Sequence, residues 1–439
     1  MNDFALSVLK KCLKNDIKKF HATSGEVISY GPSFEDLGDY LPTLIMYGEK
    51  SIWVSEVNRV IQYLEGNNSL YRDEGKGFYK QFTRCYSQTD LVWGIILAAK
   101  FDDRFIEDID VHLDRIYDEF IGSKPSFLIL NHIPYTNIKL PRLFSPKLKI
   151  TSSEDHGMYI EVLVKAYELT GQHAHLEKAK KLADHLYKSE FYRDNGFLSF
   201  YESNSIIGTI IKGKVKNFNK RNNEFQLVKQ NSNALFGLYE IGLYFKEYME
   251  IFNCAIERWL SMFYDEGTGI FYTNYNVESG KKGSDLTVFH IIELLILADK
   301  VSIAEKIANS VINTKSNVTG LMPFLNPNAE QSLKRMKLSE RCTWLDSEVD
   351  FGVALVRLYQ RTKNDYYLVV AKKINEGIEN YHVGSHGFYS CVDFDTGAVI
   401  DDTYSAKMTA LVSKLSIAIE HSEIINDRKN VYYDLLQDR

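Results

Sequence analysis

The chain has 439 residues, 45% of them hydrophobic and 25% charged, which is typical of a globular protein and excludes a disordered or collagen-like chain. The formal net charge is −6, and lysines and arginines are scattered among acids, so we expect no nucleic-acid partner. The five cysteines lack metal-ligand or redox spacing. With no secretory signal and no apolar run near ~18 residues, we expect a cytoplasmic protein without a membrane span.

A repeating pattern predicts a series of α-helical hairpins. Each repeat opens with an acidic or polar residue, continues as an apolar helix and then an amphipathic helix, and closes with a Gly-aromatic turn. The clearest copy starts at Asp155, where HGMYIEVLVKAYELTG is apolar on most faces and QHAHLEKAKKLADHLYK follows. In that second helix we expect His173, His175 and His185 to face solvent.

Similar starts of apolar helices recur along the chain. They lie at Asp36, Asp90, Asp155, Asn231, Asp285, Asp346 and Asp402. The Gly-aromatic turns at 75–79, 195–201, 267–272 and 386–390 are expected to form short β-hairpins at one end. The pattern predicts an all-α fold, a closed toroid of hairpins, with 1–439 as a single domain. An additional N-terminal helix at about 4–20 allows seven hairpins, or six with one accessory unit.

Two segments, 122–150 and 204–230, are predicted to be long loops near the mouth of the ring. The first contains four prolines, and the second is polar and basic. Loops of this length are uncommon in compact domains unless they cover a site or are mobile.

The acidic starts of the apolar helices suggest a common site. If these helices all begin at one face of the ring, their carboxylates border one cavity. For any single aspartate, helix capping is the simpler interpretation. Several carboxylates around one pocket, however, are what general acid–base catalysis at a glycosidic bond requires.

Two of these starts resemble a known family. SQTDLVWGIILA around Asp90 and EDHGMYIEVLVKAYELTG around Asp155 resemble unsaturated glucuronyl hydrolases. These belong to the six-hairpin (α/α)6 toroid glycosidase-like superfamily, which includes N-acylglucosamine 2-epimerases. The resemblance implies six hairpins, with Asp155 as general acid/base and Asp90 as its partner.

The region from Asp155 to Asp299 is also similar to the C-terminal helical domain of glucuronyl C5-epimerases. The similarity rests on AYELTGQHAHLEKA, NALFGLYEI, MFYDEGTGIFY and DLTVFHIIELL. It implies abstraction and return of a sugar proton, with Tyr272, Asp265 and His290 as the nearest candidates.

The segment CTWLDSEVDFG at 342–352 adds further candidates. Asp346 and Glu348 are candidate catalytic residues, and Trp344 and Asp350 are candidate substrate-binding residues. Asp346 and Asp350 are one helical turn apart, and tryptophan beside carboxylates suits a sugar. A solvated acidic cap is the alternative. The remaining expected substrate-binding residues are Trp93, His156, Tyr159, Asp39, Tyr40, Asn233, Tyr272 and His290.

These observations favour a carbohydrate-active enzyme, first a glycoside hydrolase acting on an oligosaccharide, uronic-acid-containing substrates included. The alternatives are a sugar epimerase (uronate C5 or 2-) or polysaccharide lyase using Tyr, His and carboxylate proton transfer, and a non-catalytic sugar-binding protein of polysaccharide metabolism. The sequence contains no phosphate loop, dinucleotide motif or metal loop, so we expect no cofactor and no metal. The expected partner is a sugar, and the expected oligomeric state is a monomer or homodimer.

Overall fold

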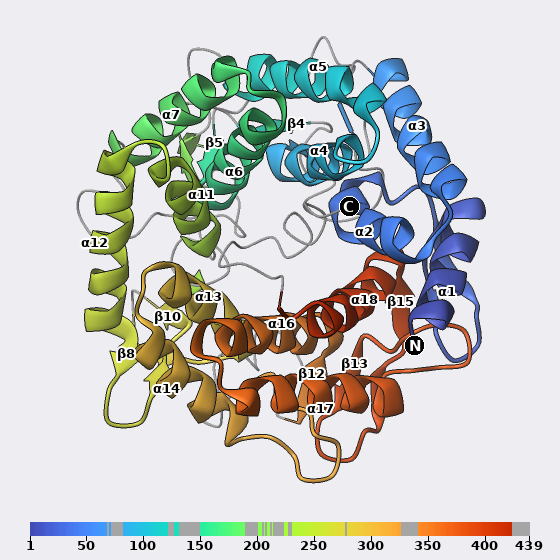
Figure 1. Cartoon of the computed structure of the whole chain (residues 1–439), viewed down its shortest axis with the longest axis vertical. Coiled ribbons are helices and arrows are strands. Elements are labelled where there is room, and N and C mark those ends of the chain that lie inside the picture. The colour runs from blue at the N-terminus through green and yellow to red at the C-terminus, as the bar shows by residue number, and fades with distance from the viewer. Residues whose placement is uncertain are drawn as a thin grey trace. The chain divides into compact units, whose positions relative to one another are not determined.

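The computed structural model (Figure 1) describes residues 1–67, 70–71, 82–121, 127–130, 150–188, 201–203, 206, 209–210, 213, 224–226, 231–276, 279–325 and 341–423. Contacts divide the chain into two compact units. Unit 1 comprises Met1–Trp53, Ile256–Tyr275 and Gly280–Arg439, and unit 2 comprises Val54–Ala255 and Asn276–Ser279. The expectation of a single domain stays a prediction. Among the described residues, no helix combines the length and apolar character that crossing a membrane requires.

Unit 2 consists of helices buried on most sides, each followed by an amphipathic helix. The buried helices are α4 (Cys85–Ala99), α6 (Ser153–Thr170) and α11 (Ser232–Gly242). The amphipathic helices are α3 (Lys50–Gly66), α5 (Ile106–Ile116), α7 (His173–Lys188) and α12 (Lys246–Phe263), of which α3 and α12 continue across the unit boundary. Helix α6 packs against α4, α7 and α11, so it forms the centre of this unit.

Unit 1 repeats this arrangement. Its buried helices are α2 (Leu37–Tyr47), α13 (Phe289–Leu297), α16 (Leu345–Thr362) and α18 (Ala406–Glu420). Its amphipathic helices are α1 (Asn2–Lys14), α14 (Val301–Ile312) and α17 (Asp365–Tyr381). Helix α18 lies beside α1, α2 and α16 (Figure 1). The N-terminal helix thus packs on the last buried helix, as expected if these two helices form a seventh hairpin.

Short antiparallel strand pairs lead directly into four of the buried helices in the described residues. The leading strands are β3 (Phe82–Arg84), β5 (Ile150–Ser152), β12 (Cys342–Trp344) and β15 (Thr403–Ser405). Their partners are β4 (Leu128–Leu130), β6 (Tyr201–Ser203), β13 (Cys391–Asp393) and β1 (Ile17–His21). The last residue of each leading strand has extended backbone and is the N-cap of the helix. Strand and helix therefore join without a loop.

The remaining described elements are short. They are β2 (Val27–Tyr30), η1 (Phe34–Asp36), η3 (Asp103–Phe105), η4 (Tyr117–Ile121), β7 (Glu224–Gln226), β8 (Tyr264–Asp265), β9 (Ile270–Phe271), β10 (Asn274–Asn276), β11 (Lys282–Gly283), η7 (Leu286–Val288) and β14 (Val399–Asp401). The hairpin expected at 267–272 is confirmed by the β8–β9 pair, and Phe388 in the turn at 386–390 bridges Val383. The turn at 75–79, most of 195–201 and most of both predicted loops lie outside the described residues.

Two of the predicted helix starts are wrong. Helix α4 begins at Cys85, so Asp90 lies within it, and Asp402 precedes β15 rather than opening α18. The leading strands are the reason, because they place the helix start at the end of the strand rather than at the aspartate. Capping by an aspartate side chain is confirmed at Asp285, which accepts from the amide of Thr287.

Helices α6 and α11 make backbone contact in unit 2. A Cβ atom on Gly157 would lie 1.9 Å from the carbonyl oxygen of Asn233, and one on Gly237 would lie 2.5 Å from that of Gly157. Farther along the same pair, Lys165 donates to Glu240 at 2.7 Å, and both side chains are buried. Glycine at 157 is therefore required for this close approach.

Glu348, in the first turns of α16, anchors the segment that precedes β12. Its Oε1 accepts from the amide of Met322 at 2.7 Å and from Thr343 Oγ1 at 2.8 Å. Burial raises the pKa of Glu348 to about 8, against the opposing effect of these two hydrogen bonds. At neutral pH this carboxyl group is mostly protonated.

We expect Gly157→Ala to lower the free energy of unfolding by roughly 1–3 kcal/mol, because the added methyl group forces two backbones apart. Gly66→Ala is the matched control, since a Cβ there meets nothing within 4 Å. Urea denaturation of both variants measures the effect. Equal stability of the two variants would contradict the close approach.

We expect Glu348 to make the protein less stable as the pH rises. Its pKa in the folded chain is higher than that of an unfolded glutamate, so its stabilising effect is complete below the unfolded pKa and is lost as the pH rises through about 8. Glu348→Gln keeps the acceptor oxygen and cannot ionise. Between pH 5 and 9 its unfolding free energy should fall less than that of the wild type, by on the order of a few kcal/mol. If the unfolding free energies of the two proteins change in parallel between pH 5 and 9, the raised pKa of Glu348 is contradicted.

Candidate functional site

Lys414 on α18 lies among carboxylates from three other buried helices of unit 1. Its Nζ donates to Asp350 Oδ1 on α16 at 2.6 Å. Burial lowers the pKa of Lys414, but the carboxylates of Asp350, Glu293 on α13 and Asp39 on α2 outweigh it, and the net shift is upward. The lysine is therefore charged at neutral pH and joins α18 to α16 through Asp350.

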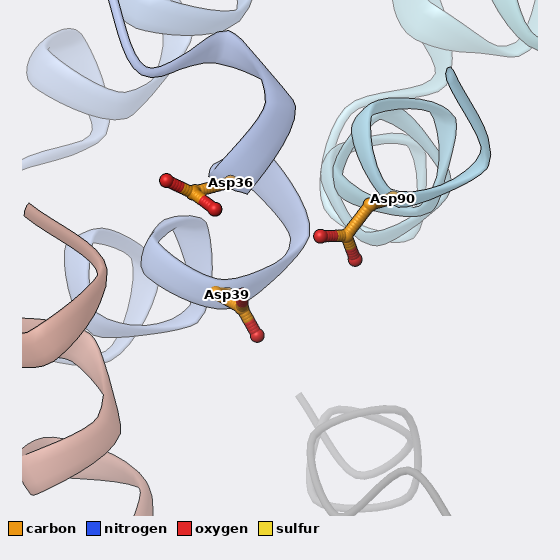
Figure 2. A group of neighbouring side chains, drawn as sticks. All are labelled: Asp36, Asp39 and Asp90. Atoms are coloured by element: carbon orange, nitrogen blue, oxygen red, sulfur yellow. The ribbon is translucent and has the colours of Figure 1, made fainter. Parts of the chain in front are cut away.

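Lys407 lies seven residues earlier on α18, in its first turn. It forms an ion pair with Asp39, and its Nζ is 3.8 Å from Asp36 Oδ1. Figure 2 shows Asp36 and Asp39 one turn apart at the start of α2; it also draws Asp90, which belongs to α4 of unit 2. We call Asp36, Asp39, Glu293, Asp350, Lys407 and Lys414 the acid–lysine cluster.

Asp36 and Asp39 form a close carboxyl pair. An oxygen of one lies within 4.8 Å of an oxygen of the other. Burial raises the pKa of Asp36 to about 7; Lys407 opposes this, whereas Glu35 and Asp39 add to it. Near neutral pH the pair therefore holds one exchangeable proton on Asp36, while Asp39 faces an ammonium group.

Ion pairs in the cluster become more buried along the helices. The side chains of Lys414 and Asp350 are 24% and 23% exposed. Farther along α16, Arg357 pairs with Glu293 at 3.2 Å, and these side chains are 1% and 8% exposed. Accessible polar atoms therefore lie at the start of α2 and in the N-terminal halves of α16 and α18. His290, one turn before Glu293, is half-buried with its Nδ1 4.0 Å from Glu293 Oε2.

The start of α16 has three accessible candidates. Trp344, Asp346 and Asp350 are half-buried, whereas Glu348 is fully buried. The ring of Trp344 packs near Phe324, with centroids 6.2 Å apart. Asp346 Oδ1 accepts from the amide of Ser347 at 2.7 Å. Of the predicted residues, the structure thus places Asp39 and Asp350 in the cluster. Asp346 lies on the helix that carries Asp350, and Trp344 is the residue just before that helix.

Asp155 occupies a different position, within unit 2. It is buried, its Oδ1 accepts from the amide of Tyr86 at 2.6 Å, and its Oδ2 bonds to the hydroxyl of Ser152. Burial raises its pKa to about 6, although Arg84 lowers it. The contact satisfies an otherwise unpaired N–H in the first turn of α4. Asp90 is half-buried on that helix, Trp93 is in the core, and Asn233 is buried in the first turn of α11.

His156 and Tyr159 have internal partners. His156 Nδ1 contacts the carbonyl of Ser152 at 2.8 Å and its Nε2 contacts His185 Nδ1 at 3.2 Å, while burial lowers its pKa to about 3. Tyr159 is fully buried and donates to the carbonyl of Leu113. The expectation that His185 and His175 face solvent is wrong, because His185 pairs with His156 and His175 is buried against Asp110.

The residues suggested by the epimerase resemblance have separate partners. Asp265 Oδ1 accepts from the amides of Gly267 and Thr268 and so caps its own hairpin. Tyr272 lies beneath the ammonium of Lys282, 5.6 Å from its ring centroid. His290 is next to Glu293, and Tyr40 is fully buried in α2.

The cluster contains residues that the sequence pattern did not single out as site residues. These are Glu293, Lys407 and Lys414, whereas Asp36 was predicted as one of the acidic helix starts around a common site. The lysines did give a signal, since they are the two charged residues of the segment 406–419 and lie seven residues apart, on one helix face.

Solved structures share this fold. The α-1,2-mannosidase from Trichoderma reesei matches with a TM-score of 0.62 and 12% identity, over 95% of this chain and 91% of that one. A sugar epimerase from a ruminal bacterium matches with a TM-score of 0.56 and 12% identity, over 83% of this chain and 98% of that one. Cellobiose 2-epimerase from Bacillus thermoamylovorans B4167 matches with a TM-score of 0.53 and 12% identity, over 82% of this chain and 99% of that one.

No protein-family model matches the sequence, and no curated protein matches it. At 12% identity the likeness to solved structures establishes the fold. The predicted fold class is confirmed: the chain has the all-α toroid fold of helical hairpins that these solved structures share.

Proposed function

We propose that the protein is a carbohydrate-active enzyme that hydrolyses a glycosidic bond in an oligosaccharide by carboxylate acid–base catalysis. The observation that carries the proposal is the Asp36–Asp39 pair, with an oxygen of one within 4.8 Å of an oxygen of the other. Glycoside hydrolysis needs one protonated carboxyl group and one ionised carboxylate on either side of the bond. The fold supports the proposal, since its solved neighbours include an α-1,2-mannosidase.

The two carboxyl groups suit different roles. Asp36, whose pKa is raised to about 7, is the proton donor to the leaving oxygen. Asp39, which pairs with Lys407, is the partner that stabilises positive charge on the sugar or activates water. Both side chains are half-buried, which leaves access for a sugar while limiting competition from water.

A second placement of the catalytic pair remains a proposal. It assigns the acid to Asp155 and its partner to Asp90, as the resemblance to glucuronyl hydrolases implies. The raised pKa of Asp155, about 6, supports an acid role. Its hydrogen bonds to Tyr86 and Ser152 support a structural role instead, because both carboxyl oxygens are occupied.

Sugar epimerisation is the second candidate function. Its specific support is the series His290–Glu293–Arg357, in which a half-buried imidazole lies beside a carboxylate that pairs with an arginine. Such an imidazole can abstract and return a proton. Two of the solved neighbours are named as sugar epimerases.

We also propose a cytoplasmic location, a sugar as the partner, and a monomeric or homodimeric state.

We expect Asp36→Asn to reduce oligosaccharide hydrolysis roughly a hundredfold or more, because the proton donor is lost. The loss should be much smaller with a dinitrophenyl glycoside, whose leaving group needs little protonation. Wild-type kcat/KM should fall as the pH rises through about 7, when Asp36 loses its proton.

Reducing-end release measures this hydrolysis, and Asp299→Asn, in an exposed ion pair with Arg361, is the control. An Asp36→Asn variant with full activity would remove the assignment. Sugar that gains carbon-bound deuterium in heavy water, without bond cleavage, would favour epimerisation instead.

If Asp155 is the catalytic acid and Asp90 its partner, the Asp155→Asn variant should lose turnover and melt at the wild-type temperature. If Asp155 only joins α6 to the start of α4, the variant should keep its activity and melt at a lower temperature. Thermal unfolding and reducing-end release on the same sample separate the two roles. Full activity rules out catalysis by Asp155.

A further inference from the structure

The cations of the acid–lysine cluster are already matched by carboxylates. Lys407 pairs with Asp39 and lies near Asp36, and Lys414 pairs with Asp350. Deeper in the same unit, Arg357 pairs with Glu293. The described parts of α2 and α13 contain no lysine or arginine, and the remaining cation of α16, Arg361, pairs with Asp299 at the protein surface. The cluster thus offers no unmatched positive charge.

This balance of charges disfavours an anionic sugar relative to a neutral one. A sugar carboxylate brought to Lys414 or Lys407 would lie close to Asp350 or Asp39, and like charges repel strongly at half-buried positions. A neutral sugar meets no such repulsion. Its hydroxyl groups can donate to the carboxylates and accept from the lysines, whereas a carboxylate can only accept.

We infer that the acid–lysine cluster takes a neutral sugar and rejects the uronic acid of the same configuration, an inference that rests on the proposed function. The discriminating residues are the lysines' carboxylate partners, above all Asp350. Asp350 holds Lys414 by one oxygen and is half-buried. Removing its charge leaves Lys414 with a positive charge available to a ligand.

The experiment compares dissociation constants by NMR titration for three pairs that differ in charge at C6: glucose and glucuronate, galactose and galacturonate, mannose and mannuronate. For the wild type, the tightest-binding hexose should bind about tenfold or more tightly than its uronate. Asp350→Asn should shift this ratio about tenfold toward the uronate. Asp299→Asn, which frees Arg361 at the surface, should leave the ratio unchanged.

Two results overturn the inference: a wild type that binds the uronate more tightly, or an Asp350→Asn variant whose ratio does not move. Reducing-end release from oligosaccharides distinguishes this failure from failure of the proposed function. A protein that prefers uronates and still cleaves oligosaccharides keeps the proposed function and loses the inference. A protein that binds none of the six sugars and cleaves nothing contradicts both.

Discussion

One lysine in an apolar helix constrains unit 1. Lys414 donates to Asp350 on α16, and the charges of Asp350, Glu293 on α13 and Asp39 on α2 together hold its pKa above the ordinary value despite burial. Removing Asp350 would leave the ammonium group without its hydrogen-bonded carboxylate in a half-buried place, so α16 and α18 must keep their mutual position. A buried ion pair adds little net stability compared with apolar packing. The Lys414–Asp350 pair instead contributes by position, because it fixes which side chains face the accessible end of the cluster.

The same constraint creates the chemistry proposed for the site. Burial raises the pKa of Asp36 to about 7, whereas Lys407 pairs with Asp39 one turn farther along the chain. Deeper along the helices Arg357 and Glu293 are closed off from solvent, so reactive groups concentrate near the helix starts. In unit 2, the pair Lys165–Glu240 joins α6 to α11 in a fully buried setting. Similar ion pairs thus serve packing in one unit and a candidate site in the other.

Much of the fold could be predicted from the sequence, since apolar periodicity marks each buried helix and the Gly-aromatic turn at 267–272 marks a hairpin. The starts at Asp90 and Asp402 were misplaced because three-residue strands are too short to show a period of two. Asp39 and Asp350 could be found as acids near helix starts. Lys407 and Lys414 could not be assigned, because their partners lie hundreds of residues away or on another helix. His156 and Tyr159 looked like ligand residues, yet burial and internal partners occupy them.

The direct joint between leading strand and buried helix limits how such a chain can change in length. Each residue added to an α-helix turns the following side chains by about 100°. One residue inserted between β12 and α16 would therefore swing Asp350 away from Lys414, while β13 would still hold the strand in register. Length variation among related chains should therefore be absent from these joints.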